Sequence, residues 1–497
     1  MGYIEGADRY QPRIMCLNDM VAKDARVRII DRFVEVTDLA TLGFSNTTPA
    51  HLGRASYSPE CMVKLYMFGY EKGVRSSRKL EALCNTDIEV MWLLGELKPD
   101  FKTIADFRKD NIEAFVTLFG EFCRFLDEIG LFGKKVVAID GTKVKASSSR
   151  KKHYSKKKLK KLIDYNREKI EEYFSELEET DEAELTEEVA AKVALHNKRM
   201  KDYEEMLDEL ERTGEDAISL TDQDARMMSM GNMGVGMAYN VQTAVDGKNH
   251  LVSEFSVITD AADQGQLADI AKKTLDTRGK PEDNDEGEVS TVFLADKGYY
   301  DGKDLARCEE FGIDAVVACQ DKPTYKSRGE EFQVEHFAYD KGTDSYLCPQ
   351  GAELTCRSKP TTKVRNYHNA KACRSCEHRD FCVPKNSNKR VLRRWPHNDA
   401  LDRAQDKYAK QSELYKLRQQ IVEHVFGTIK RTMDSGYLLL RTRRKAEGEM
   451  ALVFTGYNLK RAHAILGFDK IMETLDTLAL MRCKKRLSAC LFSLIQR

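Results

Sequence analysis

Hydrophobic residues recur every three to four positions through the first 130 residues of the chain. The spacing is clearest in Val27–Val34, Cys61–Phe68 and Phe115–Leu126, and it is typical of helices that bury one face. Ser58 followed by Pro59 adds a helix start, because serine caps helix N-termini and proline is favoured in the first turn. Residues 1–130 are therefore expected to form an all-α N-terminal domain.

Beyond this region, β-branched and alternating runs favour strands. Lys134–Ile139 predicts a strand, and Asp140-Gly141 predicts the turn that ends it. Two alternating runs flank Asp246-Gly247, which is the pattern of a β-hairpin over residues 237–258. A helix is expected next over Leu267–Leu275, followed by a buried strand over Ser290–Asp296 and a short strand over Asp314–Cys319. Strands and helices in this order indicate a mixed α/β domain.

Long segments interrupt the α/β pattern. In residues 156–212, apolar positions recur three, four and seven residues apart on both sides of a polar break at 179–185, which predicts an antiparallel helical hairpin. Residues 320–411 show little periodicity. After them, single helices are expected over Glu413–Thr432 and Ala451–Leu466.

Composition excludes some classes of protein and leaves others open. The 497 residues contain 80 Lys+Arg and 80 Asp+Glu, so the formal net charge is zero. The mean hydropathy is -0.54, and no apolar run approaches the roughly 18 residues of a membrane span. The N-terminus lacks the basic start and apolar stretch of a signal peptide. The protein is expected to stay in the compartment where it is made.

The neutral total conceals opposed blocks of charge. Residues 143–161 contain ten Lys/Arg and no acid, whereas residues 168–188 contain eleven acids and one lysine. Residues 383–449 contain 16 Lys+Arg against 8 Asp+Glu, an excess of 16 − 8 = +8. Such blocks are often plain solvated surface, but they also attract charged partners. Nucleic acid therefore remains a candidate partner.

Three acids form the main candidate for a catalytic site. Asp140 and Asp296 are expected to end strands, and Glu423 lies in the helix predicted over residues 413–432. Each acid taken alone could be a turn, a cap or a surface ion-pair partner. Together, carboxylates at strand ends and on a packed helix can hold two Mg²⁺ or Mn²⁺ ions about 3.5–4 Å apart, the arrangement used in phosphodiester cleavage.

The residues around these acids resemble the DDE-class transposases of bacterial insertion sequences. The resemblance covers nearly the whole chain, from the N-terminal domain to the late helices. It is carried by Gly53–Pro59, Gly73–Glu81, Pro99–Arg108, Ile139–Ala146, Thr221–Ala225, Tyr239–Val245, Ala295–Tyr299 and Ile421–Arg431. Matched residue by residue, Asp140, Asp296 and Glu423 correspond to the catalytic acids of the family.

The resemblance implies a fold and an activity. The fold is an RNase H-like α/β catalytic core interrupted by insertions, preceded by an all-α N-terminal domain. The activity is metal-dependent cleavage at the terminal inverted repeats of an insertion sequence, followed by transfer of the liberated 3′-hydroxyl into target DNA. It further implies double-stranded DNA as partner, a homodimer or higher oligomer on that DNA, no membrane, and a bacterial cytoplasmic, nucleoid-associated location.

A related family signature, Tyr-x2-Arg-x3-Glu-x6-Lys, suggests residues that contact DNA. Tyr415, Glu423 and Lys430 match it, but Arg418 stands five positions before the glutamate where the pattern has four. Five residues rotate about 140° around a helix, against about 40° for four. The candidate DNA contacts are Lys430, Arg431, Tyr415, Arg418, Lys143 and Lys145.

The thirteen cysteines are expected to be reduced, because the chain is long, lacks a secretory signal and has an odd number of them. Cys373-x2-Cys376-x5-Cys382, with Cys348 upstream, offers four thiolates for a possible structural Zn²⁺. Cys356 or His378 could replace one ligand. Unliganded thiols are the alternative.

The sequence thus predicts a transposase with defined domains. Two alternatives remain: a metal-dependent nuclease on the same fold without strand transfer, and a non-catalytic DNA-binding descendant. The expected domains are an N-terminal DNA-binding or assembly domain, 1–130; a catalytic core, 131–319 and 412–470, with the hairpin inserted at about 150–213; a cysteine-bearing insertion, 320–411; and a C-terminal tail, 471–497.

Overall fold

The computed structural model describes residues 10, 14–48, 55–149, 152–178, 183–279, 290–319, 329–356 and 364–495. Side chains are described within these ranges except for 176–178, 183–186, 232 and 481–495. Helices and sheets both contribute, so the predicted α/β class is confirmed. None of the helices within the described residues has the length and apolar character needed to cross a membrane.

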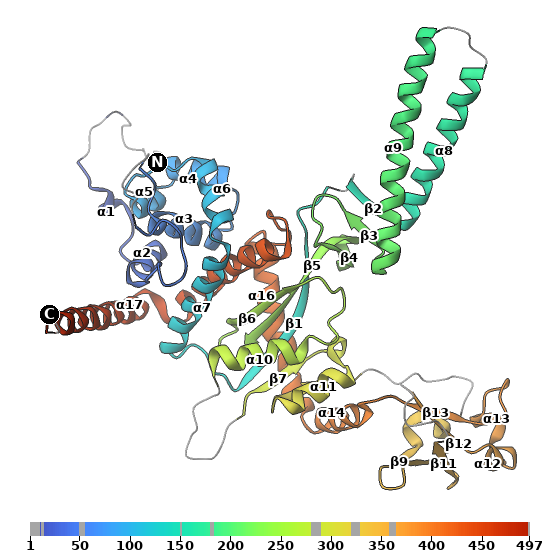
Figure 1. The fold of residues 1–497 in the computed structure, drawn as a ribbon. Coiled ribbons are helices and arrows are strands. Elements are labelled where there is room, and N and C mark those ends of the chain that lie inside the picture. The colour runs from blue at the N-terminus through green and yellow to red at the C-terminus, as the bar shows by residue number, and fades with distance from the viewer. Residues whose placement is uncertain are drawn as a thin grey trace, which may run out of the picture.

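The N-terminal region is helical, as the periodicity predicts. Ser58 caps α3 by accepting from the Cys61 amide at 3.2 Å, which confirms the predicted start. The helices are α1 Leu17–Met20, α2 Arg26–Val36, α3 Pro59–Glu71, α4 Ser77–Thr86, α5 Ile88–Leu94, α6 Phe101–Asp110 and α7 Ile112–Glu128. Figure 1 places them against the long C-terminal helix α17, Arg443–Ile495.

The central sheet has the strand order β4-β5-β1-β7-β8, with β6 paired to β5. β5 and β6 form the predicted antiparallel hairpin, and β1, β7 and β8 run parallel to one another. Helices α10, Leu267–Arg278, and α11, Gly302–Glu310, pack beside the strands. The strands are β1 Val136–Lys145, β4 Arg226–Ser229, β5 Val235–Asp246, β6 Val252–Ile258, β7 Val292–Ala295 and β8 Asp314–Val317.

The predicted turn at Asp140-Gly141 is wrong. β1 continues through both residues to Lys145 and stays paired with β5, with Asp140 opposite Thr243 and Gly141 opposite Gln242. Pairing with a neighbouring strand satisfies the backbone hydrogen bonds of the Asp-Gly dipeptide, and this outweighs its local preference for a turn. Asp140 therefore lies inside a strand.

The predicted helical hairpin is present. α8, Lys156–Glu178, and α9, Ala183–Thr213, project away from the sheet, and the short strands β2, His153–Ser155, and β3, Ala217–Ser219, pair at their base (Figure 1). Apolar residues fill the seam between the helices, among them Ile170, Val189 and Val193.

The segment after β8 contains a sheet that its weak periodicity did not predict. The strands pair antiparallel in the order β13-β12-β11-β10-β9 around a small core that includes Phe332, Tyr367 and Leu392. The elements are β9 Ala338–Asp340, β10 Ser345–Leu347, β11 Glu353–Cys356, β12 Arg365–His368, α12 Ala370–Arg374, α13 Arg379–Cys382 and β13 Val391–Arg394.

The helical character predicted over residues 413–432 is confirmed, although the segment is divided into shorter pieces. It consists of α15, Ser412–Tyr415, α16, Leu417–Gly427, and a π-helical turn, η6, over Thr428–Thr432, and it follows α14, Asn398–Lys410. π-Helical turns of this kind often occur at functional sites. The helix predicted over residues 451–466 is part of α17, whose helical path is interrupted at Gly467 by a positive φ of 74°.

One hydrophobic core joins the N-terminal helices, one face of the sheet and α17. Phe255 of β6 lies with its ring centroid 5.2 Å from that of Phe119 in α7 and 5.1 Å from that of Phe454 in α17. A buried ion pair lies in the same contact region: Arg75 donates to Glu449 at 3.0 Å and to the Tyr437 carbonyl at 2.7 Å. The N-terminal helices and the sheet are therefore packed as one body.

Replacing Arg75 with Met should lower the free energy of unfolding by about 3–5 kcal/mol, because it leaves the carboxylate of Glu449, which is 0% exposed, without its cationic partner. The matched control is Arg403→Met, which removes an exposed pair with Glu309 and should cost about 0–1 kcal/mol. Urea unfolding followed by tryptophan fluorescence measures both changes. Equal costs for the two variants would contradict the role given to Arg75.

Candidate active site

Asp140 and Asp296 lie at the same edge of the parallel strands. β1 pairs with β7 from Val136 opposite Val292 to Ala138 opposite Leu294. Two further steps along each strand reach Asp140 and Asp296, although Asp296 already lies just beyond the last residue of β7. Carboxyl ends of parallel strands are where α/β sheets bind ligands. The expectation that Asp296 directly follows a strand is confirmed.

The Asp140 carboxylate is half-buried among charged groups. Its Oδ1 accepts from the Gly141 amide at 2.9 Å, and its Oδ2 lies 3.4 Å from a guanidinium nitrogen of Arg418. Burial raises the pKa of Asp140 to about 6; the positive charge of Arg418 opposes this rise, and Asp296 and Asp263 add to it. Negative charge is therefore concentrated at this edge, as a site for cations requires.

The Asp296 carboxylate is held by the turn that follows it. Asp296 caps η3, Lys297–Tyr299, and its Oδ1 accepts from the Gly298 amide at 2.8 Å. Gly141 and Gly298 thus play the same part, because each donates its amide to a carboxylate oxygen of a nearby acid. Both acids are oriented by the backbone.

Glu423 lies on α16, which packs against β1 (Figure 1). Its side chain is exposed and accepts from Gln419, one turn earlier, at 2.7 Å. Within the described residues, no group of three or more His, Cys, Asp or Glu side chains is arranged to hold a metal ion. The structure brings Asp140 and Asp296 together, and Glu423 as their third partner stays a prediction.

Arg418 reaches the acids despite its shifted spacing. Arg418 and Glu423 lie on the same helix, α16, so the five-residue spacing holds: Arg418 lies beside Asp140, whereas the Glu423 side chain is exposed. Burial disfavours the Arg418 guanidinium, but Asp140, Tyr415 and Asp296 outweigh this effect and raise its pKa. Arg418 is consequently an electrostatic partner of both acids.

Lys430 and Arg431 lie on the π-helical turn η6. Burial lowers the pKa of Lys430, with Asp140 raising it and Lys143 lowering it further, so Lys430 lies within electrostatic range of both. Arg431 is exposed. Lys145 ends β1, where its amide donates to the Gly436 carbonyl at 3.2 Å. Of these three candidates, Lys430 is the one whose ammonium group is placed within electrostatic range of Asp140.

Asp263 is a residue of this region that the sequence did not single out. It follows β6 in a loop, and its Oδ1 accepts from Asn240 at 2.7 Å, Gln242 at 2.8 Å and Lys143 at 2.9 Å. The available signal was an acid a few residues past a predicted strand, the same context as Asp296. Lys143, proposed as a DNA contact, is thus ion-paired within the protein.

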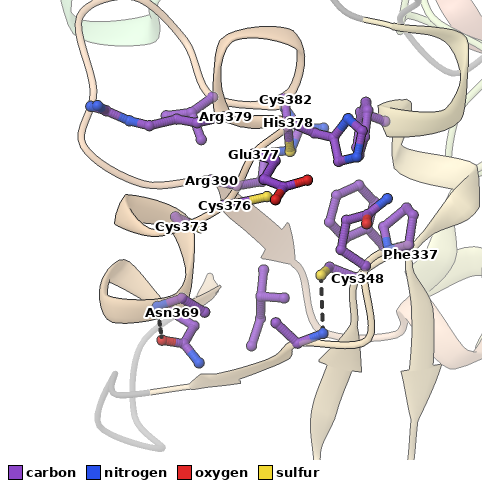
Figure 2. A pocket seen from close by; sticks show the side chains of 17 residues that line it. Phe337, Cys348, Asn369, Cys373, Cys376, Glu377, His378, Arg379, Cys382 and Arg390 are labelled. Atoms are coloured by element: carbon purple, nitrogen blue, oxygen red, sulfur yellow. Dashed lines mark hydrogen bonds between the residues drawn. The ribbon is translucent and has the colours of Figure 1, made fainter.

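The cysteines of the predicted zinc site line one pocket of about 240 Å³ in the β9–β13 segment (Figure 2). Burial raises the pKa of Cys382 to about 11, the nearby Arg390 lowers it, and the other thiols raise it further. His378 lines the same pocket, as do Cys348, Cys373 and Cys376. The described side chains nevertheless form no metal-holding group here. The structure thus gathers these cysteines without supporting the zinc prediction.

Asp222 and Asp224 serve as local anchors. The Asp222 carboxylate is 1% exposed and accepts from the Tyr239 hydroxyl at 2.7 Å and the Thr442 amide at 3.0 Å. Asp224 accepts from the Arg443 amide at 2.9 Å. Both carboxylates hold the segment that leads into α17, so their contacts are those of structural residues.

Comparisons with known families match both ends of the chain. A family model described as a transposase domain (DUF772) matches residues 15–110, which hold most of the N-terminal helices. A second, described as a transposase DDE domain, matches residues 347–463, which include Glu423 but neither Asp140 nor Asp296. Neither the curated proteins nor the solved structures gave a match.

The two matches agree with the fold. A DDE domain implies an RNase H-like core, and the mixed sheet that carries Asp140 on β1 and Asp296 just after β7 has that α/β character. The transposase domain at the N-terminus coincides with the predicted helical region. The two family matches, over residues 15–110 and 347–463, support an insertion-sequence DDE transposase.

Proposed function

We propose that this transposase cleaves DNA at the terminal inverted repeats of its element and transfers the liberated 3′-hydroxyl into target DNA. One observation carries the proposal: Asp140, within β1, lies level with Asp296, just past the end of β7, and Arg418 lies beside Asp140. A phosphodiester-cleaving site needs such a pair of carboxylates to hold metal ions. The guanidinium group of Arg418 is a cationic side chain that could bind a phosphate there.

The donor set fits a hard divalent cation. Asp140 and Asp296 would hold Mg²⁺ or Mn²⁺ through carboxylate oxygens, the ligands that these ions prefer, with Glu423 as the third acid. Bound there, a pair of such ions would activate the attacking hydroxyl and stabilise the leaving oxygen. The raised pKa of Asp140 agrees with this assignment: burial is the main cause of the rise and Asp296 and Asp263 add to it, so a bound cation would stabilise the ionised carboxylate.

The chain's own residues would orient the phosphate and balance its charge. Lys430, half-buried near Asp140, can place its ammonium group on a phosphate oxygen without a large desolvation cost on binding. Tyr415, the last residue of α15, interacts with Arg418 at the start of α16, and both side chains could contact the DNA backbone near Asp140. The amides of Gly141 and Gly298 keep both carboxylates in fixed orientations.

The basic block after Asp140 supports DNA as the partner. Lys157, Lys160 and Lys161 are exposed on the first turns of α8, at the base of the hairpin. Phosphate contacts from such side chains bind DNA without regard to sequence and weaken as salt displaces them. Assembly of two or more copies on the DNA is part of the proposal.

Asp140→Asn, Asp296→Asn and Glu423→Gln should each reduce Mg²⁺-dependent cleavage of a labelled element-end duplex by at least about 100-fold, because each removes an anionic oxygen from the proposed ion site. DNA affinity, measured by fluorescence anisotropy without metal, should stay within about threefold. The matched control is Glu413→Gln, an exposed acid on α15 that pairs with Lys416.

Cleavage at the wild-type rate by the Asp140 or Asp296 variant would refute the proposed site. The same result for the Glu423 variant alone would remove that residue from the acid set. Cleavage without joining of the 3′-hydroxyl to a target duplex would favour a nuclease, and binding without cleavage by the wild-type protein would favour a non-catalytic descendant.

Lys430→Met should weaken DNA binding and reduce the slope of log Kd against log salt concentration by about 0.9, the value for one phosphate contact. Lys470→Met, an exposed lysine on α17, is the control and should leave the slope unchanged. Anisotropy titrations between about 50 and 200 mM salt measure both slopes. An unchanged slope for the Lys430 variant would show that its ammonium group contacts no phosphate.

A further inference from the structure

We propose that Asp263 is a positioning residue for the two strand-end acids: it packs against Gly141 and Gly298, the glycines whose amides hold the carboxylates of Asp140 and Asp296. The inference rests on the proposed function and deepens it. Asp263 itself is assigned no contact with DNA or with a metal ion.

The first support is the polar layer that Asp263 organises, which consists of Lys143, Asn240, Gln242 and Asp263. Gly141 and Lys143 on β1 lie opposite Gln242 and Asn240 on β5, so these four residues share one face of the sheet. Asp263 lies over this face, and its Oδ1 accepts hydrogen bonds from Lys143, Asn240 and Gln242. One side chain therefore fixes the polar layer.

The second support is close packing against Gly141. A Cβ atom at Gly141 would overlap the Asp263 carboxylate oxygen and lie 2.6 Å from Gln242 Nε2. The backbone of β1 at this point can therefore approach the polar layer only as glycine. The same peptide unit donates its N–H to Asp140, on the opposite face of the strand.

The third support is the turn after β7. A Cβ atom at Gly298 would lie 3.7 Å from the other Asp263 oxygen, so Asp263 borders this turn as well. Tyr299, which is fully buried, donates its hydroxyl to Gln242 and thereby ties the turn to the polar layer. Since the Gly298 amide holds Asp296, a shift of Asp263 would reach both acids through the backbone.

Electrostatics agree with this placement. Asp263 is among the groups that raise the pKa of Asp140, after burial and together with Asp296. Lys143 neutralises Asp263 from within the layer, with the two side chains 17% and 25% exposed respectively. The Lys143–Asp263 pair therefore supports the backbone on the other face of β1 from Asp140 and has no net charge of its own.

Asp263→Ala should lower the single-turnover cleavage rate by about 10–100-fold, the usual cost of removing a residue that orients a ligating side chain. DNA affinity without metal should change by less than about threefold, since the phosphate contacts remain. Asp263→Asn keeps the oxygen that accepts from Asn240 and Gln242, so it should recover much of the lost rate. Asp344→Ala is the control, because Asp344 also accepts from several donors, Tyr339 and Tyr367 among them, but lies in the β9–β13 segment.

A second pair of variants covers the case in which Asp263→Ala does not fold, as judged by its melting temperature. Gly141→Ala should slow cleavage as strongly, because the new methyl group displaces Asp263. Gly236→Ala, on the adjacent strand, should not, because its Cβ meets only the flexible end of Met230, at 3.0 Å. Equal effects of the two glycine variants would overturn the inference.

Three further outcomes have defined meanings. A wild-type rate for Asp263→Ala overturns this inference and leaves the proposed function intact. Parallel loss of rate, affinity and melting temperature, with no recovery in Asp263→Asn, also overturns it, because that pattern is a folding defect. An inactive wild-type protein on element-end DNA overturns the proposed function, and this inference with it.

Discussion

The arrangement of the site depends on β1, which pairs antiparallel with β5 on one side and parallel with β7 on the other. The parallel pairing brings Asp140 level with Asp296. The antiparallel pairing continues past Asp140 and builds the polar layer behind it. Strand side chains alternate between the two faces of a sheet. Asp140 therefore faces Arg418 on one side of β1, while Gly141 lies against the polar layer on the other. A one-residue slip of β1 would send Asp140 to the wrong face.

A second constraint keeps the two matched regions together. α17 contacts the N-terminal helices and the sheet through one apolar core, and Gly456 permits this approach, since a Cβ there would lie 2.9 Å from the Glu71 amide. Arg75 links the turn between α3 and α4 to the segment that follows η6. The N-terminal region is therefore fixed to the segment directly after the turn that carries Lys430.

Much of the fold could be predicted from local patterns, and the failures have physical causes. The helical hairpin and the β5–β6 hairpin could be predicted because the spacing of their apolar residues is visible in the sequence. The extension of β1 through Asp140-Gly141 could not be predicted, because the backbone partners that stabilise it come from β5, about 100 residues later. The β9–β13 sheet has strands of three or four residues, which are too short for a period of two to be recognised.

The site residues could be predicted where an acidic residue lies beside a predicted strand. They could not be predicted where their role depends on contacts between distant segments of the chain. Asp140 and Asp296 could be selected as acids in or after predicted strands, but the spacing along α16 could not show that Arg418 lies beside Asp140, because that contact joins the helix to β1. For Asp263 the sequence offers only its place a few residues past a predicted strand, because its importance comes from donors on β1 and β5. The neutral net charge of the chain is likewise uninformative about the site. Acids and bases are paired or segregated by the fold, so the total charge carries little information about an edge where Asp140 meets Arg418 and Lys430.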